Sequence, residues 1–548
     1  MTDRAVAASH TLMNTQVDAQ TGRAETTPKL SHADLPATGQ KGLIVHNTAL
    51  NLVGQWVPLL VGLFAIPYIV SELGPGRFGL LSVGWVVLGY FSVLDLGFGR
   101  ATTKFVAECL EQGQTERVPA LLWTSLSVLV LLGSVAAVLA AVLTPVAVTK
   151  LLKIPPPLIG EARTAFLILA ASFPAVVATN AVRGVLEAAQ RFDLVNYVKV
   201  PANISVFVLP VIALLFGSHL PGIFLLLVLS RLIAMLAYLA CCYRTFPALR
   251  HCFSMDLKLF GQLLGYGGWL TLSTVLGTLL MSMDRLLIGS RLPVAVVGYY
   301  AAPYEAVARV WTIPGSLSST LFPTFSSMGL ASESKTHLEQ LYCRSLKSLL
   351  LTLGPLISMV IVFAPQLLGI WLGPVFAAKS STVMQVLALG VLVNSLAFVP
   401  FTLIQALGRP DVTAKFHMIE FPLFAGLLWV LIGHDGIQGA AIAWTIRLTL
   451  DAALLFGGCA WLGFVPLRAF ARNGLPRTCL AVLLFAVACP AALLISKTLW
   501  ARTVFVGILT ALFAVGGWSF ILDSIDKAAL ASAAAKWLRV VRERRHAH

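Results

Sequence analysis

Charged side chains occur inside stretches of the sequence that are otherwise apolar, and some of them are spaced to meet. Glu305 precedes Arg309 by four residues, and Arg447 precedes Asp451 by four, which brings each pair to one face of a helix. Arg231 lies in a similar stretch without an acid three or four residues away. A charge within a membrane span costs about 2.5–3.5 kcal/mol on insertion scales, so such residues usually face an interior and often mark a path. Alternatively, each pair simply neutralises itself to permit insertion.

Arginine suits phosphate, because its planar fork donates paired hydrogen bonds and its charge survives the loss of water. No reactive grouping accompanies these arginines, since the sequence has no catalytic constellation, no metal-ligand spacing and no cofactor motif. The eight cysteines all fall in predicted inner loops or helices, which does not indicate a disulfide framework. We therefore expect a site that binds, with no enzymatic chemistry, metal or cofactor.

Further polar residues have two interpretations each. The adjacent pair Asp284 and Arg285, near the predicted outer end of its span, is either an outer gate or an interfacial anchor. The loop charges hold the inner ends of helices in register or form an inner gate: Arg191, Asp193, Arg409 and Asp411. A polar stripe on the first predicted helix either makes packing hydrogen bonds or lines a polar route: Asn47, Asn51 and Gln55.

Composition identifies the elements that must hold these residues. With 58% hydrophobic and 11% charged residues, the 548-residue chain is far from the soluble norm of roughly half apolar and a quarter charged. Windows of roughly 20 residues, the length that crosses a bilayer, predict an all-α integral membrane protein with 14 transmembrane helices. Their ranges are 44–70, 78–99, 119–147, 164–189, 194–216, 221–242, 261–289, 296–326, 348–367, 380–406, 412–432, 437–461, 478–496 and 503–522.

The distribution of basic residues predicts the orientation. With both tails inside, 26 Lys and Arg residues lie on the inner side, 8 on the outer side and 5 within helices. This bias follows the positive-inside rule and puts both termini in the cytoplasm. It also accounts for the net charge of +15 without nucleic acid. Residues 1–42 are predicted to be a disordered cytoplasmic tail, and 524–548 a basic tail against the lipid surface.

An internal repeat divides the predicted helices into two lobes. Arg-x-Asp recurs at an offset of 218 (191 and 409), Ser71, Leu73 and Gly79 recur at 219, and Arg231 recurs as Arg447 at 216. Two lobes of six helices in parallel topology, 43–243 and 257–461, follow from this offset, with an extra pair at 477–523. A substrate site is expected around a central cavity between the lobes, near the midplane.

The region from Asn47 to Glu108 resembles the N-terminal signature of bacterial polysaccharide flippases, within the multidrug/oligosaccharidyl-lipid/polysaccharide exporter superfamily. The motifs are Leu-Gly-x-x-x-Phe-Gly at Leu73 to Gly79 and Asp-Leu-Gly-Phe-Gly at Asp95 to Gly99. Met283 to Val310, followed by Leu-Phe-Pro-Thr-Phe-Ser-Ser, repeats the resemblance in the second half. In the related peptidoglycan-precursor flippase an extra helix pair forms a groove for the lipid tail, and helices 13 and 14 are expected to fit that pattern.

The resemblance implies a protein of the bacterial inner membrane that moves an undecaprenyl-pyrophosphate-linked oligosaccharide to the outer leaflet by alternating access. Since the family's cavity is lined chiefly by helices 1, 2, 7 and 8, Arg309 ranks first for pyrophosphate contact, with Glu305 as its orienting or protonatable partner. Arg231, Arg447 and Asp451 lie on helices that are more peripheral in the family. Implied partners are the lipid-linked substrate, membrane lipids, and a polysaccharide polymerase with export machinery.

Two alternatives remain. A cation-coupled multidrug exporter of the same superfamily predicts cavity acids without excess arginine. A membrane-embedded glycosyltransferase or ligase predicts a sizeable outer loop or domain, whereas the longest predicted outer segments, 148–163 and 368–379, are short.

Overall fold

The apolar stretches of the sequence form long helices in the computed structural model. It describes residues 37–93, 98–250, 276–277, 279–328, 332–491, 498–521 and 527. Regular structure in these ranges is helical apart from one bridge between Lys153 and Pro293. Both predicted tails, except 37–42 and 527, lie outside the described residues. So does most of the predicted span 261–289.

The first half of the chain contains helices that overlap every predicted span, and their bounds are α1 (Ala37–Val93), α2 (Phe98–Glu111), α3 (Val118–Val146), α4 (Pro156–Ala170), α5 (Phe173–Ala188), α6 (Phe192–Leu215) and α7 (Leu220–Thr245). The backbone of α1 breaks at Gly74, with φ of 70°, so the single label covers two helices. Short helical turns lie at Thr115–Arg117, Ala147–Leu151 and Pro247–Arg250.

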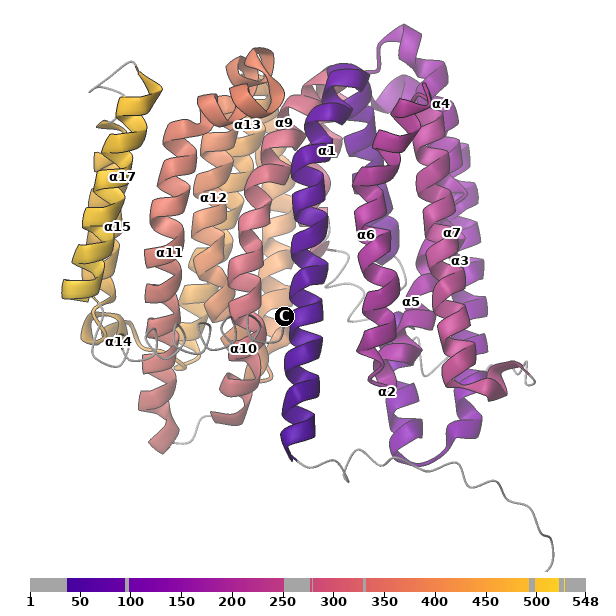
Figure 1. Ribbon diagram of the computed structural model, residues 1–548, viewed down its shortest axis with the longest axis horizontal. Helices are drawn as coiled ribbons and strands as arrows, with labels where there is room; N and C mark the ends of the chain where they lie inside the picture. The colour runs from indigo at the N-terminus through magenta and orange to yellow at the C-terminus, as the bar shows by residue number, and fades with distance from the viewer. Residues whose placement is uncertain are drawn as a thin grey trace, which may run out of the picture. The chain divides into compact units, whose positions relative to one another are not determined.

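The second half begins with a helical segment at 279–291. It continues with α9 (Val294–Ala308), η5 (Arg309–Trp311), α10 (Thr312–Met328), α11 (Ser332–Leu372), α12 (Pro374–Ala406), α13 (Pro410–Trp461), α14 (Leu467–Arg472), α15 (Leu475–Ala488), α17 (Leu499–Gly516) and η6 (Gly517–Ile521). In Figure 1, α11, α12 and α13 run side by side, and these helices also make extensive mutual contacts.

Eight helices in the described part of the chain are long and apolar enough to cross a membrane. One of them, α13, has 52 residues, or about 78 Å at 1.5 Å per residue, against a hydrocarbon layer of about 30 Å. Its backbone breaks at Gly436, where φ is 58°, a value that glycine adopts without a Cβ clash. The chain is therefore an all-helical, multi-pass membrane protein, and the count of fourteen spans stays a prediction.

The connections between helices repeat at the offset seen in the sequence. Arg191 and Arg409 each follow a residue with positive φ, and each donates through Nε to the Asp two residues later at 3.0 Å. Their backbone N–H groups donate to Leu186 and Ile404, which are also 218 residues apart. A left-handed glycine also recurs at an offset of 219, as Gly217 between α6 and α7 and as Gly436 within α13.

Two glycines at equivalent positions mark a close helix crossing. A Cβ on Gly79 of α1 would lie 2.1 Å from the carbonyl oxygen of Val294, and one on Gly298 of α9 would lie 3.0 Å from that of Pro75. Each such Cβ would also lie within 3.5 Å of the other glycine's backbone nitrogen. Only residues without a Cβ permit this approach, so the sequence match between Gly79 and Gly298 corresponds to a direct contact.

Candidate functional site

The predicted pair Glu305 and Arg309 forms an ion pair on α9 and η5, and the same carboxylate binds a second arginine. Arg309 Nη2 donates to Glu305 Oε2 at 3.1 Å, and Arg285 Nη2 donates to Glu305 Oε1 at 3.1 Å. The Arg285 side chain is 7% exposed and that of Arg309 is 34% exposed. The carboxylate therefore bridges a buried cation and one that other molecules can reach.

Asp284 and Arg285 lie deep in the protein. Asp284 is fully buried and accepts hydrogen bonds from the Tyr300 hydroxyl at 2.6 Å and from the Arg285 backbone N–H at 2.8 Å. The Arg285 guanidinium lies over the Tyr304 ring, 4.2 Å from its centroid. The structure thus joins this pair to Glu305 and Arg309, two groups of residues that the sequence analysis treated separately. The two predicted roles of Asp284 and Arg285, outer gate or interfacial anchor, stay predictions.

The backbone geometry changes at Arg309. The helix changes there from α to 3₁₀ over Arg309–Trp311 before α10 begins, and a 3₁₀ stretch within a helix often marks a hinge. The Arg309 guanidinium also lies 5.5 Å from the ring centroid of Phe207, on α6. Arg309 therefore contacts elements from both halves of the chain.

A second charged cluster lies between α12 and the two parts of α13. Arg447 Nη1 is 3.7 Å from Glu420 Oε2, with side-chain exposures of 4% and 0%. Asp451 instead accepts a hydrogen bond from Asn394 Nδ2 at 3.2 Å. The i, i+4 spacing predicted a pair between Arg447 and Asp451, whereas the structure pairs Arg447 with Glu420, because the turn at Gly436 folds the two parts of α13 together.

This cluster contains residues that the sequence analysis missed. His417 Nδ1, both Glu420 oxygens and Asp451 Oδ1 are buried without a hydrogen-bond partner among the described residues. The ligand atoms of His417, Glu420 and Asp451 lie within 4.8 Å of one another and could hold a metal ion. Arg447 already brings a positive charge to this place, which opposes a cation. The sequence contains one signal for this cluster: Glu420 follows His417 by three residues inside the predicted span 412–432, which brings the two side chains to one face of a helix.

The remaining predicted residues lie elsewhere. Arg231, on α7, is half-buried and has no ion-pair partner in the described part of the chain. The loop pairs Arg191–Asp193 and Arg409–Asp411 are exposed, and their hydrogen bonds raise the pKa of both arginines and lower the pKa of both aspartates, so both partners of each pair stay charged. Asn47, Asn51 and Gln55 lie within α1, but their side chains are outside the described residues.

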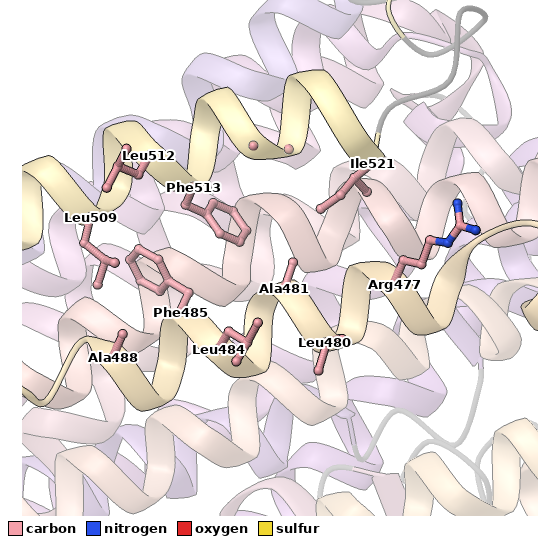
Figure 2. A pocket seen from close by; sticks show the side chains of 12 residues that line it. Arg477, Leu480, Ala481, Leu484, Phe485, Ala488, Leu509, Leu512, Phe513 and Ile521 are labelled. Carbon is pink, nitrogen blue, oxygen red and sulfur yellow. The ribbon is translucent and has the colours of Figure 1, made fainter.

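The last helices form an apolar groove of about 460 Å³ between α15 and α17. Figure 2 shows its lining, with Phe485 and Phe513 facing each other and Arg477 at one end. The ring centroids of these two phenylalanines are 5.1 Å apart. Arg477 is the one charged residue among those that line this groove.

The long apolar helices define a class, the multi-pass membrane proteins. The fold is similar to that of the lipid II flippase MurJ, with a TM-score of 0.68 and 12% identity over 86% of this chain and 99% of that one. It is also similar to a multidrug resistance MATE family transporter of the MOP superfamily, with a TM-score of 0.63 and 15% identity over 75% and 98% of the two chains.

Residues 44–329, more than half of the chain, match the family described as polysaccharide biosynthesis protein, and the chain belongs to that family. A relative in Shigella flexneri, named "Putative O-antigen transporter", is 28% identical over 414 residues, which is 75% of this chain and 96% of that protein. The chain is thus a multi-pass membrane protein of a family described by its role in polysaccharide biosynthesis. This confirms the family resemblance found in the sequence.

Proposed function

We propose that the chain is a flippase that carries an undecaprenyl-pyrophosphate-linked oligosaccharide from the inner to the outer leaflet of the bacterial inner membrane. In this proposal two six-helix lobes and an extra pair make fourteen spans, both termini are cytoplasmic, and alternating access moves the cargo. The polysaccharide made is an exopolysaccharide, a capsule or an O-antigen. The family match and the O-antigen transporter relative support the substrate class.

The observation that carries the proposal is the carboxylate shared by Arg285 and Arg309. Without cargo, Glu305 holds the Arg309 guanidinium within the protein at 3.1 Å. A pyrophosphate offers more negative charge and a better match to the guanidinium fork. Since Arg285 still binds Glu305, Arg309 can turn to the cargo without leaving that acid unpaired. Unpaired buried charge is the main penalty for breaking such a pair.

The same residue links cargo to conformation in this proposal. Arg309 lies at a 3₁₀ stretch and beside Phe207 of α6. When its guanidinium turns to the pyrophosphate, the contact with Phe207 is lost and the two halves are freed to move. Other contacts between the two halves of the chain lie toward the predicted outer end of the helices. There, Trp371 Nε1 donates to the Leu63 carbonyl at 2.7 Å, and Lys153 exchanges backbone hydrogen bonds with Gly289 and Val294.

The test compares two arginine variants in a strain that lacks the chromosomal gene. Arg309→Ala is expected to leave the lipid-linked oligosaccharide in the inner leaflet and to reduce surface polysaccharide at least tenfold, with normal protein in the membrane. Arg183→Ala is the matched control, because Arg183 has the same i, i+4 pairing with Glu187 at 3.2 Å and a similar exposure of 39%. Normal export by Arg309→Ala would reject the site, and intact surface glycan with raised drug sensitivity in the deletion strain would favour the multidrug exporter.

A further inference from the structure

A basic pocket of about 300 Å³ opens beside the apolar groove of α15 and α17. Lys347 of α11, Arg472 of α14 and Arg477 of α15 contribute to its lining. Arg472 also pairs with Glu339, and Lys347 too has an interaction partner within the protein, so neither is an isolated cation. The pocket also includes Gly474 and Pro476, at the start of α15, where a helix presents backbone N–H groups and the positive end of its dipole. An anionic group is therefore stabilised here from several directions.

The basic pocket and the apolar groove are continuous, because both are lined by Arg477 and Ile521. Figure 2 shows Arg477 and Ile521 at one end of the groove and Ala488 and Leu509 at the other. On its outer side the groove is open, since Leu480, Leu484 and Leu512 are each more than half exposed. A molecule that fits both parts must have an anionic head and an apolar chain, and it can enter from the bilayer.

The position of the basic pocket is the level of lipid headgroups. Arg472 and the start of α15 belong to the connection that follows α13, and a connection between spans lies at a membrane face. The groove then runs along α15 from Arg477 to Ala488, eleven residues or about 16 Å. One leaflet contributes about 15 Å to the hydrocarbon layer. This length fits the acyl chain of a phospholipid, while the long polyprenyl chain of the proposed substrate would extend well beyond the groove.

We propose that this composite site, formed by Lys347, Arg472, Arg477 and the groove between α15 and α17, binds an anionic phospholipid of the bilayer. The phosphate lies against Arg477 and the start of α15, with Arg472 and Lys347 beside it, and one acyl chain lies in the groove. Basic pockets between helices on the cytoplasmic side of membrane proteins bind such headgroups. This lipid is a structural partner of the last helices and not the transported cargo, so the site stands whether or not the proposed function is correct.

The experiment uses the full-length purified protein in nanodiscs that contain phosphatidylcholine with a small fraction of phosphatidylglycerol of identical acyl chains. Native mass spectrometry then counts the lipids that remain bound. We expect one phosphatidylglycerol to be retained in preference to phosphatidylcholine. Replacement of both exposed arginines, Arg472→Gln and Arg477→Gln, is expected to weaken its retention about fivefold for each charge removed. Lys415→Gln is the control, because Lys415 is a 70% exposed cation at the start of α13, away from the groove.

A second variant tests the groove without changing charge. Ala481→Trp fills the apolar lining near Phe485, and it should reduce retention of phosphatidylglycerol while the protein stays monodisperse. Equal retention of the two lipids, or wild-type retention by both the arginine and the tryptophan variants, would overturn the proposal. So would displacement of phosphatidylglycerol by undecaprenyl phosphate at equal concentration, since the site would then belong to the substrate. Loss of export in the Arg309→Ala strain does not bear on these results.

Discussion

At the scale of single residues, the most buried ion pairs in the described part of the chain join different helical segments. Glu305 binds Arg309 one turn away, as its spacing predicts, but it also binds Arg285 from the preceding helical segment. Arg447 binds Glu420, twenty-seven residues away in sequence. A sequence reveals which charges share a helix face, but a partner on another helix depends on how the helices pack. The site could therefore be predicted only in part.

Arg447→Leu should destabilise the protein strongly, because it leaves Glu420 and Asp451 buried without their cation. Breaking a buried pair by removing one partner costs about 3–5 kcal/mol, so the melting temperature in detergent should fall well below that of the wild type. The double variant Arg447→Leu with Glu420→Gln should recover part of the loss, since the unpaired acid at 420 is then neutral. A single variant that melts at the wild-type temperature would show that Arg447 does not stabilise this cluster.

At the scale of elements, the internal repeat is easier to recognise in the turns and helix crossings than in the core residues. The Arg-x-Asp turns and the pair Gly79 and Gly298 were visible in the sequence, because turn geometry and close approach restrict residue type. The equivalence of Gly217 and Gly436 was not, since a lone glycine within a helical pattern is a weak signal. Apolar positions in the spans carried little information about the repeat, because many apolar residue types can face lipid or pack against another helix equally well.

Gly79→Ala should disturb the crossing of α1 and α9. The added methyl group would lie 2.1 Å from the Val294 carbonyl oxygen, a backbone atom that cannot rotate away. Over-packing of this kind typically costs about 1–3 kcal/mol, so we expect a lower melting temperature and reduced export. Gly76→Ala is the control on the same helix, because its Cβ would meet Leu158 at an ordinary 3.4 Å. Equal melting of both variants would contradict the predicted crossing.

At the scale of the whole molecule, the number of spans depends on how the longest helices are divided. Sequence windows separate 412–432 from 437–461, and the structure agrees, since the label α13 covers two helical parts that meet at the break at Gly436 and are joined by the contact of Arg447 with Glu420. Two passes bring Arg409 and Trp461, its two flanks, to the same side of the membrane, and a single continuous helix would put them on opposite sides. The count of fourteen spans and the cytoplasmic location of both termini require two passes here.

Reporter fusions distinguish these topologies. Alkaline phosphatase, which is active only outside the cytoplasm, should be inactive when fused after Leu407 or after Leu462 and active when fused after Asp435, at the turn before Gly436. Green fluorescent protein, which folds in the cytoplasm, should give the reverse pattern at the same three sites. This arrangement follows from the inner bias of 26 basic residues against 8. Opposite signals after Leu407 and Leu462 would mean that α13 crosses the membrane once. The two parts of α13 could then not be the equivalents of α6 and α7, and the two-lobe repeat depends on that equivalence.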